Sequence, residues 1–172
     1  MYTTKRLRCE RAVKEDLAGI LAIEHDPYNS LYTFTGDMEE HCREIEDPDI
    51  FFLAIREKEG GALIGYLIVD IDRESQRLEF RRMALSRRCE GYGREVLDGA
   101  LRMAFKQWGA NKVWLEAYPD NAVGCHLYES MGFHKDGVLR QHHKAERGFL
   151  DQVQYSMLKD EYRDEYLVKY RR

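Results

Sequence analysis

A strand, a glycine-rich turn and an amphipathic helix follow one another without a break between residues 77 and 109, and this run constrains the fold most. Residues 77–85, RLEFRRMAL, alternate apolar and polar side chains, which predicts a strand with one buried face. From residue 91 to residue 109 the apolar residues recur at helical spacing. The two glycines of the intervening RRCEGYGRE leave the backbone bare where the helix begins. An anion can approach closely there, because the first turn of a helix has unpaired N–H groups and a partial positive charge.

The flanking segments predict the rest of one sheet. KEDLAGILAIEH carries apolar residues on one side of a helix, and the charged, glycine-rich REKEGGA joins two apolar strands into a hairpin. Because the elements do not alternate regularly, we predict an α/β (α+β) fold with a single mixed, mainly antiparallel sheet flanked by helices. The other predicted elements are strands at 5–12, 50–55, 63–71, 112–118 and 149–159, a helix at 14–25, and a short helix within 121–133 that Gly132 ends.

Residues 24–49 form an acidic segment with nine Asp or Glu residues against a single Arg43. Asp-Pro pairs at 26–27 and 47–48 bracket the segment, which predicts a loop or a broken helix. Two interpretations stay open: the segment gathers a cationic molecule by electrostatic steering, or it is a solvated surface. The aromatic side chains within it either line a pocket or anchor the loop; they are Tyr28, Tyr32 and Phe34.

Size and composition limit the class of protein. A chain of 172 residues fits one domain, 1–172, with 160–172 as a charged C-terminal appendage. The net charge of −4 argues against general affinity for nucleic acids. No apolar run approaches the roughly 20 residues of a membrane span, and the N-terminus lacks the apolar core of a signal peptide, so we predict a cytoplasmic protein that binds no membrane.

The cysteines and histidines predict neither disulfides nor a metal site. The four cysteines are scattered without a C-x-x-C pair, which favours reduced thiols. His142 and His143 are adjacent, and neighbours in a strand point to opposite faces, so they are poorly placed to share a metal ion.

The glycine turn has two interpretations when it is taken alone. It is either a tight turn with no ligand or a seat for phosphate, to which Arg88 and Arg94 can add charge-assisted contacts. It is not a Walker loop, because no Gly-Lys-Ser/Thr follows, and it lacks the third glycine of a dinucleotide fingerprint. If the turn binds a ligand, we expect a pyrophosphate group that belongs to a molecule other than those bound by these two motifs.

A second motif resolves these alternatives. R-x-x-G-x-G at 88–93, followed about thirty residues later by PDNAVGCHLYESMGF, resembles the GNAT superfamily of acetyl-CoA-dependent N-acetyltransferases over nearly the whole chain. LEFRRMAL, GYGREVL, VWLEAYPDNAVGCHLYESMGF and DGVLRQ resemble most the branch that acetylates the N-termini of ribosomal proteins. The chain departs from the family where Gly124 replaces the usual alanine, and where the loop after the strand is two residues short.

The resemblance implies roles for named residues. The strand backbone at Met83, Ala84 and Leu85 would bind the pantetheine arm of acetyl-CoA, with a register that the short loop leaves open by two residues. Asn121 would contact the same molecule, and Tyr128 would face its sulfur. The pyrophosphate would lie in the loop formed by Arg88, Cys89, Glu90, Gly91, Tyr92, Gly93 and Arg94.

The chemistry of acyl transfer asks for a base and an acid. Glu79 is the first candidate base, since in an alternating strand it shares a face with Met83 and Leu85; Glu116 is the second. Either carboxylate is otherwise an ordinary partner of an arginine. Tyr128 keeps its proton at neutral pH and would donate it to the departing thiolate; otherwise it is a packing residue.

The resemblance therefore implies an enzyme that moves an acetyl group from acetyl-CoA to a primary amine. The acceptor is open: a protein N-terminus, or a small molecule such as a polyamine, an aminoglycoside or an amino sugar. The enzyme is a homodimer or a monomer. The alternative is a catalytically silent domain that binds or senses acyl-CoA, which would need neither Glu79 nor Tyr128.

Overall fold

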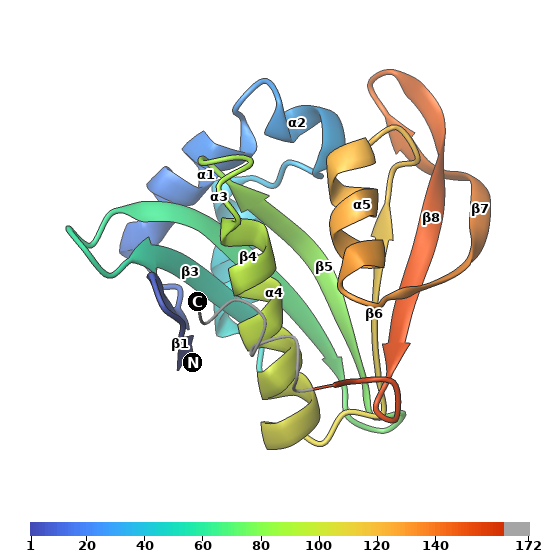
Figure 1. Cartoon of the computed structure of the whole chain (residues 1–172). Coiled ribbons are helices and arrows are strands. Elements are labelled where there is room, and N and C mark those ends of the chain that lie inside the picture. The colour runs from blue at the N-terminus through green and yellow to red at the C-terminus, as the bar shows by residue number, and fades with distance from the viewer. Residues whose placement is uncertain (164–172) are drawn as a thin grey trace.

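An eight-stranded sheet forms the centre of the computed structural model, which describes residues 1–163 (Figure 1). The strands are β1 (Tyr2–Thr3), β2 (Leu7–Arg11), β3 (Ile50–Glu57), β4 (Leu63–Asp72), β5 (Arg77–Leu85), β6 (Lys112–Ala117), β7 (His134–Ala145) and β8 (Gly148–Leu158). Their order is β1-β2-β3-β4-β5-β6-β8-β7, and only β5 and β6 run parallel. This arrangement confirms the predicted mixed, mainly antiparallel sheet.

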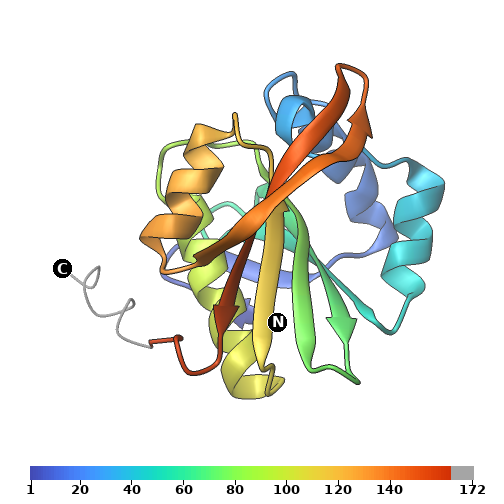
Figure 2. The ribbon, with the colours of Figure 1, turned by 90° about the vertical axis from the view of Figure 1, so that its right-hand side faces the viewer.

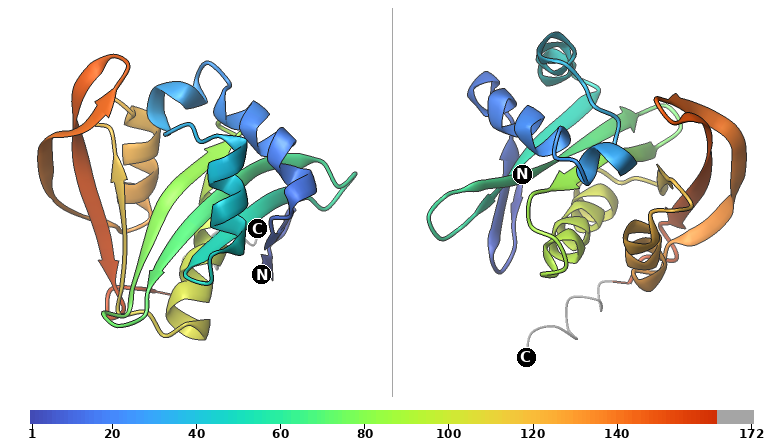
Figure 3. Two further views of the ribbon diagram at one scale, coloured as in Figure 1. Left: turned by 180° about the vertical axis from the view of Figure 1, so that it is seen from behind. Right: turned by 90° about the horizontal axis from the view of Figure 1, so that it is seen from above.

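Helices cover both faces of the sheet, as the view from above in Figure 3 shows. On one face lie α4 (Tyr92–Arg102), which carries the chain from β5 to β6, and α5 (Ala122–Ser130). On the other lie α1 (Leu17–Glu24) and α3 (Met38–Glu46), with the short α2 (Asn29–Tyr32) between them in the chain. Each face has its own apolar core: the larger one packs α4 against the sheet, and the smaller packs α1.

Most predicted elements are present with small changes in length. The strand at 77–85 has the predicted bounds, and the helix at 91–109 consists of α4 and a π-helical turn at Met103–Gln107. The acidic segment contains α2 and α3, and the Asp37 side chain caps α3 by accepting a hydrogen bond from the Glu40 N–H at 2.8 Å. Two strands were not predicted: β1 has only two residues, and the β7 side chains are largely exposed, so they lack the alternation that reveals a strand.

Most carboxylates of the acidic segment pair with cations of the protein, and two of them, Glu24 and Glu44, are buried. Seven of its nine acidic residues pair with a cation: Glu24, Asp26, Glu39, Glu40, Glu44, Glu46 and Asp49. Three of these, Glu24, Glu40 and Glu44, contact the buried guanidinium of Arg82 on β5. The segment therefore binds the sheet through charge pairs, which weakens the interpretation as a steering surface.

The C-terminal end of the described chain packs on the larger core. Within the predicted appendage at 160–172, the Tyr162 ring stacks on Phe105 with ring centroids 5.0 Å apart. Residues 164–172 of that appendage lie outside the described residues. Over residues 1–163, no helix has both the length and the apolar character needed to cross a membrane.

Candidate active site

The parallel strands β5 and β6 separate and open the sheet. Their register extends only from Arg77↔Lys112 to Glu79↔Trp114, after which the strands diverge. Among the described residues no other strand pairs with this edge of β5, so beyond Glu79 its backbone groups face a gap (Figure 1). Buried or half-buried backbone groups require hydrogen-bond partners, so this edge is suited to bind an extended ligand.

A cleft of about 640 Å³ begins at this gap and runs between α4 and α5. Its volume is typical of sites for small molecules and cofactors. Eleven residues predicted from the sequence line it: Met83, Ala84, Leu85, Arg88, Cys89, Gly91, Tyr92, Gly93, Arg94, Asn121 and Tyr128. The predicted Glu90 does not; its carbonyl accepts a hydrogen bond from Arg6 Nη1 at 3.0 Å, outside the cleft.

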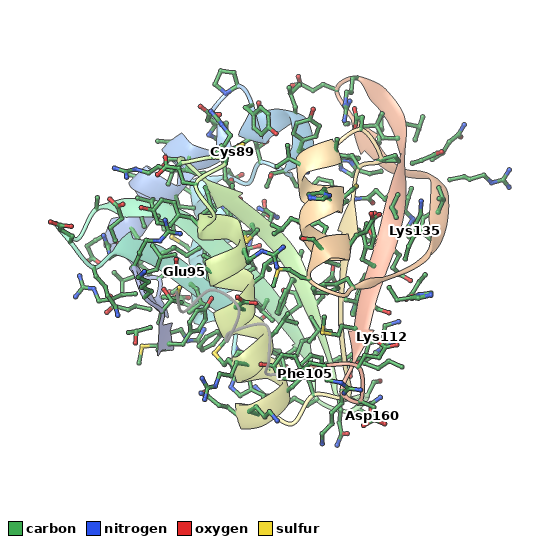
Figure 4. The ribbon with its side chains drawn as sticks, in the orientation of Figure 1. Cys89, Glu95, Phe105, Lys112, Lys135 and Asp160 are labelled. Atoms are coloured by element: carbon green, nitrogen blue, oxygen red, sulfur yellow. The ribbon has the colours of Figure 1, made fainter. Side chains whose placement is uncertain are left out.

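The start of α4 offers free donors to the cleft. Gly91 is the N-cap residue with φ +81°, a conformation that glycine adopts without strain, and no side chain caps the helix. The first helical bond is Glu95 N–H to the Gly91 carbonyl, so the N–H groups of Tyr92 and Gly93 are available to an anion. A Cβ on Gly93 would lie 3.1 Å from Leu127 Cδ2, so glycine also lets α5 approach. Figure 4 labels Cys89 in the loop just before this helix.

The arginines around the turn already have protein partners. Arg88 pairs with Asp26 at 2.7 Å, and its guanidinium lies 4.5 Å from the centre of the Tyr28 ring. Arg94 donates to Ser130 Oγ on α5. These contacts hold positive charges beside the helix start, where they add to its partial positive charge.

Asn121 and Tyr128 come from α5, which starts directly after β6. The Asn121 side chain caps this helix by accepting a hydrogen bond from the Gly124 N–H at 3.0 Å. A Cβ at position 124 would lie 2.7 Å from Asn121 Nδ2, so the glycine that departs from the family pattern suits this cap. Burial raises the pKa of Tyr128 to about 12, so its hydroxyl is protonated at neutral pH.

A second, smaller pocket of about 60 Å³ lies in the gap between β5 and β6, and we call it the side pocket. The side pocket is continuous with the cleft, because the same residues line both: Tyr32, Thr33, Met83, Asn121 and Tyr128. Glu116 lines the side pocket with a side chain that is 16% exposed, and Arg81 lies beside it. A ligand in the cleft and one in the side pocket therefore meet beside Tyr128.

Glu79 lies outside both cavities. The β4–β5 register passes from Val69↔Phe80 to Ile68↔Arg82, which leaves Arg81 in a bulge. Because of this extra residue, Phe80 and Met83 both face the larger core, and the prediction that Glu79 shares a face with Met83 and Leu85 is wrong. Burial, then the charges of Asp70 and Glu116, raise the pKa of Glu79 to about 7.

The β7–β8 hairpin encloses the side pocket, which the sequence did not predict. Figure 2 shows the hairpin beside α2, and Arg147 near its tip donates a hydrogen bond to the Leu31 carbonyl of α2 at 3.2 Å. Arg147 also pairs with Asp120 and lies over the ring of Tyr118, which lines the pocket. Arg147 therefore links the tip of the hairpin to α2 and to the Tyr118 side of the side pocket, and we call this contact the roof.

Comparisons with known proteins agree with this geometry. A match of 29% identity over 73 residues, which spans 42% of this chain and 41% of the relative, is to the uncharacterized N-acetyltransferase p20 of Bacillus licheniformis. Solved structures share the fold at lower identity. A spermidine N-acetyltransferase from Vibrio cholerae, in complex with CoA and spermine, is 20% identical with TM-score 0.81 and covers 91% of this chain and 98% of its own. An acetyltransferase of the GNAT family from Bacillus anthracis is 15% identical with TM-score 0.80 and covers 92% and 98%.

The sequence profile of the acetyltransferase (GNAT) family matches residues 17–133. This range contains α2, β5, the loop at the start of α4, and α5, which line the cleft. The chain belongs to the acetyltransferase (GNAT) family.

Proposed function

We propose that this protein transfers the acetyl group of acetyl-CoA to a small primary amine. The observation that carries the proposal is the continuity of the two cavities: the cleft meets the side pocket beside Tyr128. The free edge of β5 and the uncapped start of α4 fit the amide groups and the pyrophosphate of coenzyme A. Acetyl-CoA supplies the thioester when it is bound.

Glu116 is the general base of the proposed reaction. An amine with a lysine-like pKa pays about 4.6 kcal/mol to lose its proton at pH 7. Glu116 accepts that proton, directly or through water, as the nitrogen forms its bond to the acetyl carbon. Tyr128 donates its proton to the sulfur as the carbon–sulfur bond breaks, and backbone N–H groups near Met83–Leu85 stabilise the negative charge on the acetyl oxygen.

The acceptor is a slim amine that reaches the gap end-on. The side pocket is small, and the Arg147 contacts hold a roof over it. A polyamine is the first choice, since a structural neighbour is a spermidine acetyltransferase. The motifs that resemble the ribosomal-protein branch make an N-terminal peptide the second choice, which needs the roof to open.

A thiol-release assay with acetyl-CoA tests the function, with polyamines, aminoglycosides, amino sugars and N-terminal peptides as acceptors. We expect release with a small amine. Binding of acetyl-CoA without release on any acceptor would instead support the silent acyl-CoA-binding domain.

Two matched variants then test the base. Glu116→Gln should lower kcat/KM at least ~10²-fold, and Glu79→Gln should have a smaller effect. If Glu79 were the base, its pKa of about 7 would set the acidic limb of the kcat/KM profile, and Glu79→Gln would abolish that limb. That result would reverse the assignment.

A further inference from the structure

A bulge in β7 turns two adjacent histidines toward the same side of the sheet. The β7–β8 register passes from Leu139↔Gln152 to His143↔Leu150. Within the bulge Gln141 has φ +50°, and its N–H donates to Asp151 Oδ1 at 2.7 Å. This conformation is strained for a residue with a side chain, and such bulges redirect side chains next to active sites.

Each of the two histidines contacts a side chain that lines the side pocket. His142 Nε2 lies 3.6 Å from Glu116 Oε2, and His143 Nδ1 lies 2.6 Å from the Tyr118 hydroxyl. β8 lies between β6 and β7, so both contacts reach across it. Glu116 and Tyr118 are two residues apart and line the same pocket, so both contacts lie on the same side of the sheet. The sequence-based expectation that His142 and His143 point to opposite faces is therefore wrong.

The proposed reaction has to release a proton at every turnover. A protonated amine that becomes an amide loses two protons, and one of them replaces the proton that Tyr128 gives to the coenzyme A thiolate. The other proton leaves Glu116 before the next turnover. The side pocket has room for only a few water molecules, and the acceptor displaces them. Glu116 therefore needs a route to solvent that does not pass through the occupied pocket.

We propose, on the basis of the proposed function, that His142 is this route: it takes the proton from the Glu116 carboxyl group and passes it to solvent. Its side chain is 49% exposed, whereas that of Glu116 is 16% exposed, so His142 connects the carboxylate with bulk water. An imidazole suits this task because it gains and loses a proton near neutral pH. His142 acts through Glu116 and does not touch the substrate.

The other charged groups near this pair do not offer the same route. Glu79 faces Glu116 but lies outside both cavities, and the Arg81 guanidinium pairs with Glu44 and Asp70. Burial and the neighbouring His142 lower the pKa of His143, so His143 is neutral, and its Nδ1 is hydrogen-bonded to the Tyr118 hydroxyl. Among these groups of the described residues, His142 is the one that combines contact with Glu116 and a solvent-exposed ring.

The first test measures kcat of His142→Gln in weak and strong buffer. Glutamine keeps a polar side chain but has no group that gains or loses a proton at these pH values. We expect kcat to fall by about tenfold in weak buffer, and to recover as imidazole is added, because a small buffer replaces the lost relay. His134→Gln is the matched control: His134 lies on the same strand, is 71% exposed and lines neither cavity. An unchanged kcat, or a loss that imidazole does not restore, would overturn the proposal.

The second test is independent of activity. The imidazole ¹⁵N shifts of His142 at pH 7 should differ between the wild type and Glu116→Gln, while those of His134 stay the same. Identical His142 shifts would show that the two groups share no proton and would refute the relay. If the wild-type protein transfers acetyl to no amine, the proposed function is refuted. The comparison of ¹⁵N shifts would still show whether His142 and Glu116 share a proton.

Discussion

Removal of His41 should change how the stability of the protein depends on pH. The His41 imidazole is fully buried between α1 and α3, and both of its nitrogens contact carboxylates. Nδ1 lies 2.6 Å from Glu44 Oε2, and Nε2 lies 3.1 Å from Glu24 Oε2. Burial alone would lower the pKa of His41, but hydrogen bonds and charges from these two carboxylates outweigh it and raise the pKa to about 9.

The size of the effect follows from this shift. Against an unfolded value of 6.5, a folded pKa of about 9 corresponds to about 3 kcal/mol of folding free energy. Because the folded pKa is raised, this contribution is complete below pH 6.5 and is lost as the pH rises toward 9. The pKa values of Glu24 and Glu44 are lowered despite burial, since His41 donates to both, so their contribution is lost in acid. The network should stabilise the protein most between about pH 5 and 6.5.

Urea unfolding of the wild type and His41→Gln between pH 5.5 and 9.5 measures this difference. We expect the variant to be less stable by about 3 kcal/mol at pH 6, and the two proteins to converge toward pH 9.5. Titrating groups that do not contact His41 are common to both proteins and cancel in the difference. His134→Gln should follow the wild type throughout. A difference that stays constant over the whole range would refute a charged His41.

Two further predictions concern the cleft. Gly91→Asp places a negative charge at the start of α4, so calorimetry should show acetyl-CoA binding weakened at least tenfold. The control is Gly60→Asp: Gly60 has a similar φ of +77° but lies in an open hairpin turn, so this variant should bind acetyl-CoA as the wild type does. Equal affinity in both variants would remove the pyrophosphate from this turn. Tyr128→Phe should lower kcat about 10²-fold with little change in acetyl-CoA affinity, and a normal kcat would exclude Tyr128 as the acid.

The sequence predicted the parts of the fold in which local pattern and tertiary structure agree. Strand 77–85 alternates between core and surface, and the start of α4 has glycine where the backbone needs a positive φ. The same agreement explains why eleven of the predicted cofactor and catalytic residues line the cleft. The two motifs that form the walls are local in sequence, so a single chain reveals them.

The remaining parts of the site depend on contacts that are distant in sequence. The roof over the side pocket joins Arg147 to Leu31 and Asp120, and no local pattern indicates this contact. The β7 strand has no buried face to produce alternation, so no strand bounds were predicted for it. Asn29 was also missed: it lines the cleft, and its Nδ2 donates to the Leu85 carbonyl at 3.2 Å, a contact between segments 56 residues apart.

Two bulges account for both errors about the direction of side chains, and both lie at the active site. The extra residue at Arg81 turns Glu79 away from the cleft and lets the adjacent Arg81 and Arg82 both reach Glu44. The bulge at Gln141 brings His142 to Glu116. Strand alternation assumes two residues per repeat. The one extra residue in β5 reverses every later assignment in that strand, whereas β7 has two extra residues between Leu139 and His143, and Gln141 with φ +50° breaks the alternation there. The same two insertions therefore favour Glu116 over Glu79 as the base and give that base an exposed imidazole, which is why the choice of carboxylate and the role of β7 depend on each other.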